Sequence, residues 1–177
     1  TGHTAETSIA DGDTILIHDA SASALRKMTK ANFVSGIGGA NTPAFLVKLS
    51  APQNITTGTW TKITFDSEVY DTDDKFASNK FTPTVAGTYN FMLQVTIDDL
   101  ADTKNLHLQI YKNGSAQGTS LIRLRASGTE KHSAWCNWSD ISDGDDYYEA
   151  YVFHDIGTTK PIRVDHSTIF SGYKLLT

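Results

Sequence analysis

Residues 43–177 predict an all-β fold, either a β-sandwich or a jelly roll. Apolar and polar residues alternate over short stretches, most clearly over residues 89–97, as in strands that bury one face. Clusters of Gly, Asn, Asp and Ser, which favour turns, separate these stretches. No stretch in this part repeats apolar residues at helical spacing. These observations together indicate many short strands packed in two layers.

The predicted strands follow one another along the chain. They cover residues 45–49, 60–65, 89–97, 106–111, 121–124, 147–153 and 169–176. Asn113 and Gly114, which both tolerate a positive φ, predict a type I′ hairpin turn. Cys136 lies in a further strand-like segment, where a lone cysteine is expected to be a small buried apolar group.

Residues 1–42 are expected to form a separate connector module. Residues 13–19 and 25–29 read as the two strands of a hairpin. Thr29 is placed to cap a short helix over residues 30–37, which the following glycines end. Because so few positions can be buried, the module is not expected to fold as a lone monomer.

Composition excludes several classes of function. The chain of 177 residues has a formal net charge of -5 and no run of Lys or Arg, so nucleic acid is not an expected partner. Its apolar stretches are far shorter than the ~18 residues of a membrane span, so no membrane insertion is expected. The single cysteine rules out an internal disulfide. Since the chain begins at Thr1 rather than Met, we expect it to be part of a longer protein.

A set of residues at fixed intervals gives the sequence its most specific signature. These residues are Phe65, Asp71, Phe76, Phe81, Gly87, Tyr89 and Phe91, and at the end of the chain Phe170, Gly172 and Tyr173. The spacing resembles that of the C1q-like domain family, the trimeric jelly rolls related to tumour necrosis factor. The sequence departs from the family pattern in two places. The interval from Phe76 to Phe81 is two residues shorter than usual, and Leu93 stands where the family has an aromatic residue. The resemblance implies a homotrimeric C1q/TNF-like jelly-roll β-sandwich.

The connector module also resembles a known module, one that recurs in bacteriophage virion and tail-fibre proteins upstream of a C-terminal tip domain. The pattern begins with Asp-Gly-Asp at residues 11–13 and continues with an apolar run that ends at Asp19. Small residues follow at 20–24, and then the segment 25–29. Both resemblances together imply a virion structural protein, the trimeric tip of a phage tail fibre or spike. Its partners would be an upstream fibre shaft and a host cell-surface glycan or protein. The alternative is a secreted, extracellular C1q-like recognition or adhesion module of cellular origin.

No motif predicts an enzyme, and no catalytic residue is assigned. The sequence lacks a nucleophile elbow and a phosphate-binding loop, and its six histidines lack the spacing of zinc ligands. A glycan depolymerase would need paired carboxylates in a groove, which sequence alone leaves open.

Acidic turns supply the candidate binding residues. Asp73, Asp74 and Asp102 lie in loops that we expect at the end of the domain remote from the connector or on its outer flanks, where they could bind a sugar or a bridging calcium ion. Asp145 and Asp146 are candidate calcium ligands, because a Gly-Asp pair precedes a strand here as in C1q-like domains, some of which hold calcium. No cofactor other than calcium is expected. The competing interpretation for each cluster is turn stabilisation by Asp.

The predicted strand over residues 147–153 carries aromatic rings on both faces. If its even-numbered residues fill the core, the three rings of the other face need another cover. We therefore expect Tyr147, Tyr151 and Phe153 at the trimer interface. The competing interpretation is that packing within the chain hides them.

Overall fold

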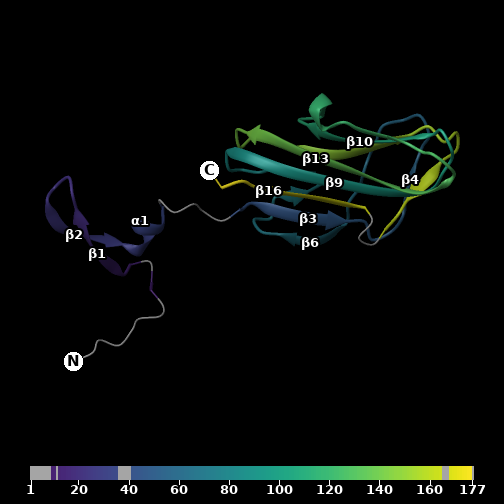
Figure 1. The fold of residues 1–177 in the computed structure, drawn as a ribbon. Helices are drawn as coiled ribbons and strands as arrows, with labels where there is room; N and C mark the ends of the chain where they lie inside the picture. Colours follow the sequence, from purple (N-terminus) through teal and green to yellow (C-terminus); the bar gives the residue numbers. More distant parts are fainter. Residues whose placement is uncertain (1–8, 11, 36–40, 165–167, 177) are drawn as a thin grey trace. The chain divides into compact units, whose positions relative to one another are not determined.

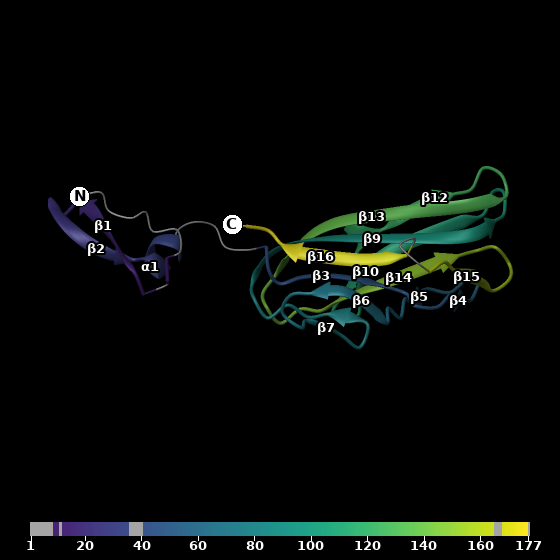
Figure 2. The same cartoon turned by 90° about the horizontal axis from the view of Figure 1, so that it is seen from below.

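The computed structural model describes residues 9–10, 12–35, 41–164 and 168–176. Contacts within the chain divide it into two units, with the division after residue 40, close to the predicted boundary after residue 42. The second unit is a sandwich of two sheets (Figures 1 and 2), which confirms the predicted fold class. Each unit is described by itself.

The first unit is a hairpin followed by a short helix. β1 (Thr14–Asp19) pairs antiparallel with β2 (Ala24–Thr29), and α1 (Lys30–Ser35) follows at once. Oγ1 of Thr29 accepts a hydrogen bond from the Asn32 N–H at 3.2 Å, which confirms the predicted helix cap. The predicted end of the helix and the glycines after it lie outside the described residues. Leu16 and Leu25 remain 68% and 67% exposed, so the unit leaves large apolar side chains uncovered.

One sheet of the sandwich contains both the first and the last strand of the domain, and we call it the terminal sheet. Its strands lie in the order β4 (Gln53–Ile55), β15 (Lys160–Ile162), β9 (Gly87–Leu100), β16 (Ile169–Lys174), β3 (Ala44–Lys48) and β6 (Ser67–Asp71), and β13 (Glu130–Ser142) also pairs with β9. In Figure 1, β13, β9, β16, β3 and β6 follow one another across this sheet.

The other sheet is built around β14, and we call it the β14 sheet. Its strands lie in the order β11 (Ser115–Ala116), β10 (Asn105–Lys112), β14 (Tyr148–His154), β8 (Lys80–Phe81) and β7 (Phe76–Ala77), while β12 (Ile122–Arg125) pairs with β10 and β5 (Thr61–Lys62) pairs with β14. The 3-10 turn η1 (Gly118–Ser120) joins β11 to β12. Asn113 and Gly114, with φ of 52° and 72°, connect β10 to β11, which confirms the predicted two-residue turn.

The strand prediction was incomplete: the short strands β4, β6, β7, β8, β11 and β15 were not predicted, and two longer segments differ from their prediction. The 13-residue β13 was missed apart from the segment around Cys136, because Trp135 and Ile141 on its outer face are apolar and obscure the alternation. The strand predicted over residues 60–65 is shorter, since β5 covers Thr61–Lys62 alone. The N–H of Thr64 donates to Oε1 of Gln53 at 2.9 Å, so a side chain takes the place of a ladder partner.

Six aromatic residues of the family signature fill the core. Phe65, Phe76, Phe81, Tyr89, Phe91 and Phe170 are all buried. The ring of Phe91 lies 4.3 Å from that of Tyr148, between centroids. Gly172 is buried against two core rings, those of Phe91 and Phe45. A Cβ at this position would lie 2.6 Å from Phe91 Cδ1 and 2.9 Å from Phe45 Cε1. Glycine is therefore required at this position for packing.

The two ends of the sandwich are distinguished by where the chain enters and leaves. The Lys174 N–H donates to the carbonyl oxygen of Pro43 at 3.1 Å, so the domain begins and finishes at the same end, which we call the tethered end. Leu100 pairs with Glu130 at the opposite end of the long β9–β13 ladder. We call that the remote end.

Candidate functional site

The predicted ligand-binding carboxylates lie at opposite ends of the sandwich. The Thr72 N–H donates to the Ala44 carbonyl oxygen at 2.9 Å, so the neighbouring Asp73 and Asp74 lie at the tethered end. This corrects the expectation that both lie at the remote end; the β3–β6 pairing turns the loop back towards the start of the domain. Asp102 follows β9 and lies at the remote end, as expected. The three carboxylates therefore do not form one site.

Asp102 joins two loops of the remote end. Its Oδ1 accepts a hydrogen bond from the Gly128 N–H at 2.8 Å, and its own N–H donates to Thr129 Oγ1 at 3.2 Å. Nearby, Asp99 pairs with Lys160 at 3.3 Å. These contacts give the acidic residues of this end a structural role, while a ligand role for Asp102 stays a prediction.

The surroundings of Asp146 do not fit a calcium ion. Its Oδ2 lies 2.9 Å from the ammonium of Lys112, and its Oδ1 accepts a hydrogen bond from Asn113 Nδ2 at 2.7 Å. Burial raises the pKa of Asp146, but the hydrogen bonds from Lys112 and Asn113 outweigh burial and the pKa is lowered. Lys112 thus supplies the positive charge there. Asp145 is exposed, and no cluster of three metal-ligating side chains occurs among the described residues.

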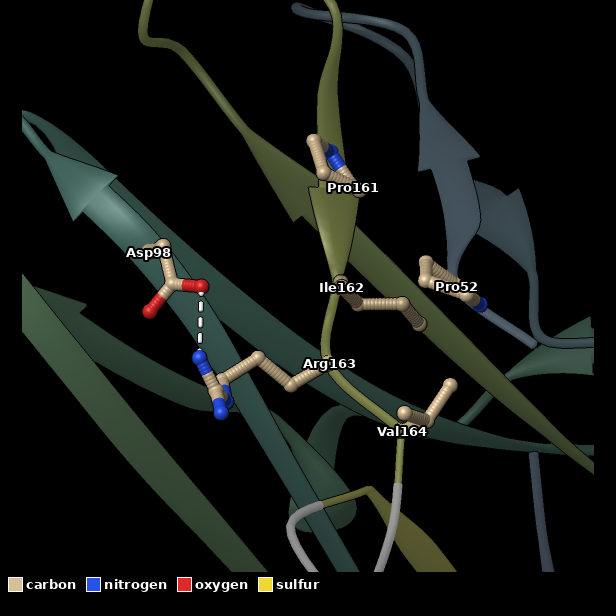
Figure 3. A pocket seen from close by; sticks show the side chains of 6 residues that line it. All are labelled: Pro52, Asp98, Pro161, Ile162, Arg163 and Val164. Atoms are coloured by element: carbon tan, nitrogen blue, oxygen red, sulfur yellow. Dashed lines mark hydrogen bonds and ion pairs between the residues drawn. The ribbon is translucent and has the colours of Figure 1, made fainter. Parts of the chain in front are cut away.

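Figure 3 shows a pocket of about 220 Å³ beside β15. Pro52, Pro161, Ile162 and Val164 line it with apolar surface. Its one ion pair is internal, because Arg163 Nη1 donates to Asp98 Oδ2 at 2.8 Å. The pocket therefore presents no unpaired charge that would select a ligand.

The three rings predicted to lie at an interface are partly covered within the chain. As predicted, Tyr148, Ala150 and Val152 are buried, so the odd-numbered residues of β14 face outward. The ring of Tyr151 stacks on that of Tyr111, with 3.8 Å between centroids. The ammonium of Lys80 lies 4.5 Å from the centre of the Tyr147 ring. The competing interpretation thus accounts for part of their cover, and the interface assignment stays a prediction.

Phe153 belongs to a row of side chains that crosses the outer face of the β14 sheet. His107 lies opposite Phe153 on one side and opposite Arg123 on the other. The ring of Trp60 lies 5.6 Å from Phe153, so the row reads Arg123, His107, Phe153, Trp60. Sequence reasoning missed this row apart from Phe153, because its members come from four separate segments.

The outer face of the terminal sheet has a different composition. Its outward residues on three neighbouring strands are Ser133, Trp135, Asn137, Ser139 and Ile141 of β13, Thr88, Asn90, Met92, Gln94 and Thr96 of β9, and Ile169, Ser171 and Tyr173 of β16. None of these is charged. Trp135 and Ile141 are 58% and 72% exposed. Sequence reasoning missed this face, although the apolar residues on both faces of β13 were a signal for it.

The buried thiol is not placed for chemistry. Cys136 is fully buried and its Sγ donates to the Ser120 carbonyl oxygen at 2.8 Å. Burial raises its pKa to about 12, so it stays protonated.

Among the described residues, no helix has the length and apolar character needed to cross a bilayer.

A two-sheet sandwich whose first and last strands are neighbours, with an aromatic core, defines a jelly roll of the C1q and tumour necrosis factor type. Residues 44–175 match the model of the C1q domain, and the chain belongs to this family. No curated protein matches the sequence.

Solved structures agree with this fold. A crystal structure of murine APRIL at pH 5.0 superposes with a TM-score of 0.57 at 11% identity, over 75% of this chain and 98% of that chain. Eiger TNF from S. frugiperda has a TM-score of 0.55 at 9% identity, over 75% of this chain and 91% of that chain. The globular domain of zebrafish complement 1qA protein has a TM-score of 0.48 at 16% identity, over 76% of this chain and 98% of that chain.

Proposed function

We propose that this protein is a homotrimeric recognition module that binds its partner without catalysis. One observation carries the proposal: the outward residues 133–141 of β13, 88–96 of β9 and 169–173 of β16 include large exposed apolar side chains and no charge, and the charged Lys131 and Asp98 lie beyond them towards the remote end. Exposed apolar patches flanked by polar residues mark interaction surfaces. Membership of the C1q domain family supports both self-association and recognition.

The finer proposal is that the module forms the tip of a bacteriophage tail fibre or spike and attaches the virion to a host-surface glycan or protein. Its support is the resemblance of the first unit to modules of virion proteins. The apolar side chains that this hairpin and helix leave exposed suit a unit that packs against further chain, such as a fibre shaft. Three copies of a weak site on one tip would raise avidity against a dense surface ligand.

The second candidate is a secreted recognition or adhesion module of cellular origin. The C1q domain match favours it. Both candidates require binding to a surface molecule, and they differ in the partner. Binding of purified protein to a panel of bacterial cells, compared with animal cells, separates them.

Light scattering after size exclusion tests the trimer, which should have three times the mass of the 19.3 kDa chain. Trp135→Asp should yield monomers if the terminal sheet forms the interface, because an unpaired charge would be buried in each subunit. Tyr151→Asp should yield monomers instead if the β14 face does. A monomeric wild type at micromolar concentration would rule out the proposal. Because Trp135 is largely exposed in the single chain, its variant should still fold.

A further inference from the structure

The outer face of the β14 sheet combines aromatic rings with unpaired positive charge. Its cations are Arg123, Arg125, Lys62 and Lys80, and its carboxylates are Glu149 and, at the end of β14, Asp155, which lies close enough to act on His107. Glu149 is neutralised locally, because its Oε1 lies 2.6 Å from the ammonium of Lys62. Neither Arg123 nor Arg125 forms an ion pair or a hydrogen bond with any described residue. The face is therefore cationic in a chain whose formal net charge is -5.

The unpaired guanidinium of Arg123 stands at one end of the aromatic row. His107 faces it across the β10–β12 ladder, and the rings of His107 and Phe153 stack with 5.2 Å between centroids. Trp60 closes the row at the other end, 6.2 Å from His107 and nearer to Phe153. All three rings are only partly buried, so each retains some surface for contact.

The residue pairs that follow His107 and Phe153 along β10 and β14 supply hydrogen-bonding groups. Tyr151 lies opposite Gln109, and Tyr111 lies opposite Glu149. The hydroxyl groups of Tyr111 and Tyr151 make no hydrogen bond with any described residue, and partial burial raises the pKa of each. Both phenols therefore stay protonated and can donate as well as accept.

We infer that this face binds an acidic saccharide, with Arg123 pairing with a sugar carboxylate and the row formed by His107, Phe153 and Trp60 supporting the sugar rings. A guanidinium matches a carboxylate with two parallel hydrogen bonds. Sugar rings present C–H groups on one face, which an aromatic surface can cover, and hydroxyls at their edges, which Tyr111 and Tyr151 can bind. The inference rests on the proposed recognition function, for which it names the ligand class.

Charge complementarity favours this occupant over a second copy of the chain. A subunit packed here would bury the unpaired guanidinium of Arg123, which costs several kcal/mol without a partner charge. The uncharged part of the terminal sheet, formed by the outward residues of β13, β9 and β16 named above, carries no such cost. Self-association through the terminal sheet would leave the β14 face free for ligand.

The test uses the whole chain and oligogalacturonate, a uronic acid polymer, with its methyl ester as the matched uncharged probe. Calorimetric titration should show binding of the free acid, with the ester at least about tenfold weaker, because esterification removes the carboxylate that pairs with Arg123. Arg123→Gln should weaken binding by at least about tenfold. Arg125→Gln is the comparison: it removes the same charge from the same face, two residues along β12 and opposite Asn105 rather than an aromatic ring, so it should weaken binding less than Arg123→Gln.

Several results would overturn the inference. These are absence of binding by the free acid, equal binding of acid and ester, equal weakening by the two arginine variants, or dissociation of the oligomer by Tyr151→Asp. Equally tight binding of polyglutamate or of single-stranded DNA would assign the face to an acidic peptide or to nucleic acid instead. If the protein adsorbs to cells and Arg123→Gln does not reduce adsorption, this inference fails and the proposed function stands. A monomer that adsorbs to no cell contradicts the proposed function, whatever oligogalacturonate does.

Discussion

The two outer faces of the sandwich have opposite chemistry, although the same aromatic core lies beneath both. The outward residues 133–141 of β13, 88–96 of β9 and 169–173 of β16 are uncharged, and Trp135 and Ile141 among them are largely exposed. The outer face of the β14 sheet carries cations, and its rings are partly covered by one another. An uncharged apolar face suits permanent contact with an identical surface, whereas a cationic aromatic face suits a polar anionic ligand. This difference is the reason for proposing that one face serves assembly and the other recognition.

Both sheets pack on the same core, so a substitution in the core should affect both outer faces. Tyr89→Ala should have the largest effect, a loss of about 3–5 kcal/mol in the free energy of unfolding, because a fully buried ring is removed. Its hydroxyl also donates to the Val85 carbonyl oxygen at 2.7 Å. Urea unfolding measures the loss. Thr88→Ala, the neighbour on the outer face, is the control and should change little; an unchanged midpoint for Tyr89→Ala would contradict the core assignment.

Gly172→Ala should cost less, about 1–3 kcal/mol, since the added methyl group forces two core rings to move. Ser171→Ala is the matched control, because its side chain lies on the outer face of the same strand. Thermal unfolding of the two variants should differ clearly. If both melt together, the close packing of Phe91 and Phe45 on Gly172 is wrong.

A fully buried histidine of the β14 sheet should make stability depend on pH. Burial lowers the pKa of His154, partly opposed by its hydrogen bond to the Ile55 carbonyl oxygen at 3.0 Å. The folded protein therefore binds fewer protons than the unfolded chain, whose histidines titrate near pH 6.5. Stability should be full above about pH 6.5 and fall as the pH drops through the lowered pKa.

Unfolding by urea at pH 8 and at pH 5.5 measures this dependence. His154→Gln should be less stable at pH 8 but should lose less on acidification than the wild type. His107, whose pKa burial and Arg123 also lower, adds a contribution of the same sign. The carboxyl groups of Asp146 and Asp155, with pKa values already below the usual range, act at lower pH. An identical pH dependence in the variant and the wild type would contradict the prediction.

The smallest effects are expected in the loops, away from both faces. Asp102→Ala should cost about 1 kcal/mol, because it leaves the Gly128 N–H without its acceptor. Asp73→Ala should lie within about 0.5 kcal/mol of wild type, since no hydrogen bond holds its side chain to any described residue. Adsorption to cells with calcium and with chelator tests a ligand role for either residue. Equal adsorption by both variants in both conditions would remove these loops from the recognition site.

The sequence by itself determined which side of β9 and of β14 faces the core. Alternation along β9 and β14 assigned Tyr148, Ala150 and Val152 to the interior, and local chemistry placed the turn at Asn113 and the cap at Thr29. These features depend on residues a few positions apart, so a single segment is enough to predict them.

Only the tertiary structure decided which segments lie side by side. The pairing of β16 with β9 and β3 brings the two ends of the domain together, and the return of β6 moves Asp73 to the tethered end while Asp102 lies at the other. The row from Arg123 through His107 and Phe153 likewise exists only because β12, β10 and β14 pair in one register. Alternation reports the face of a residue but carries no information about its neighbours on other strands, because strand order and register are set by packing between distant segments.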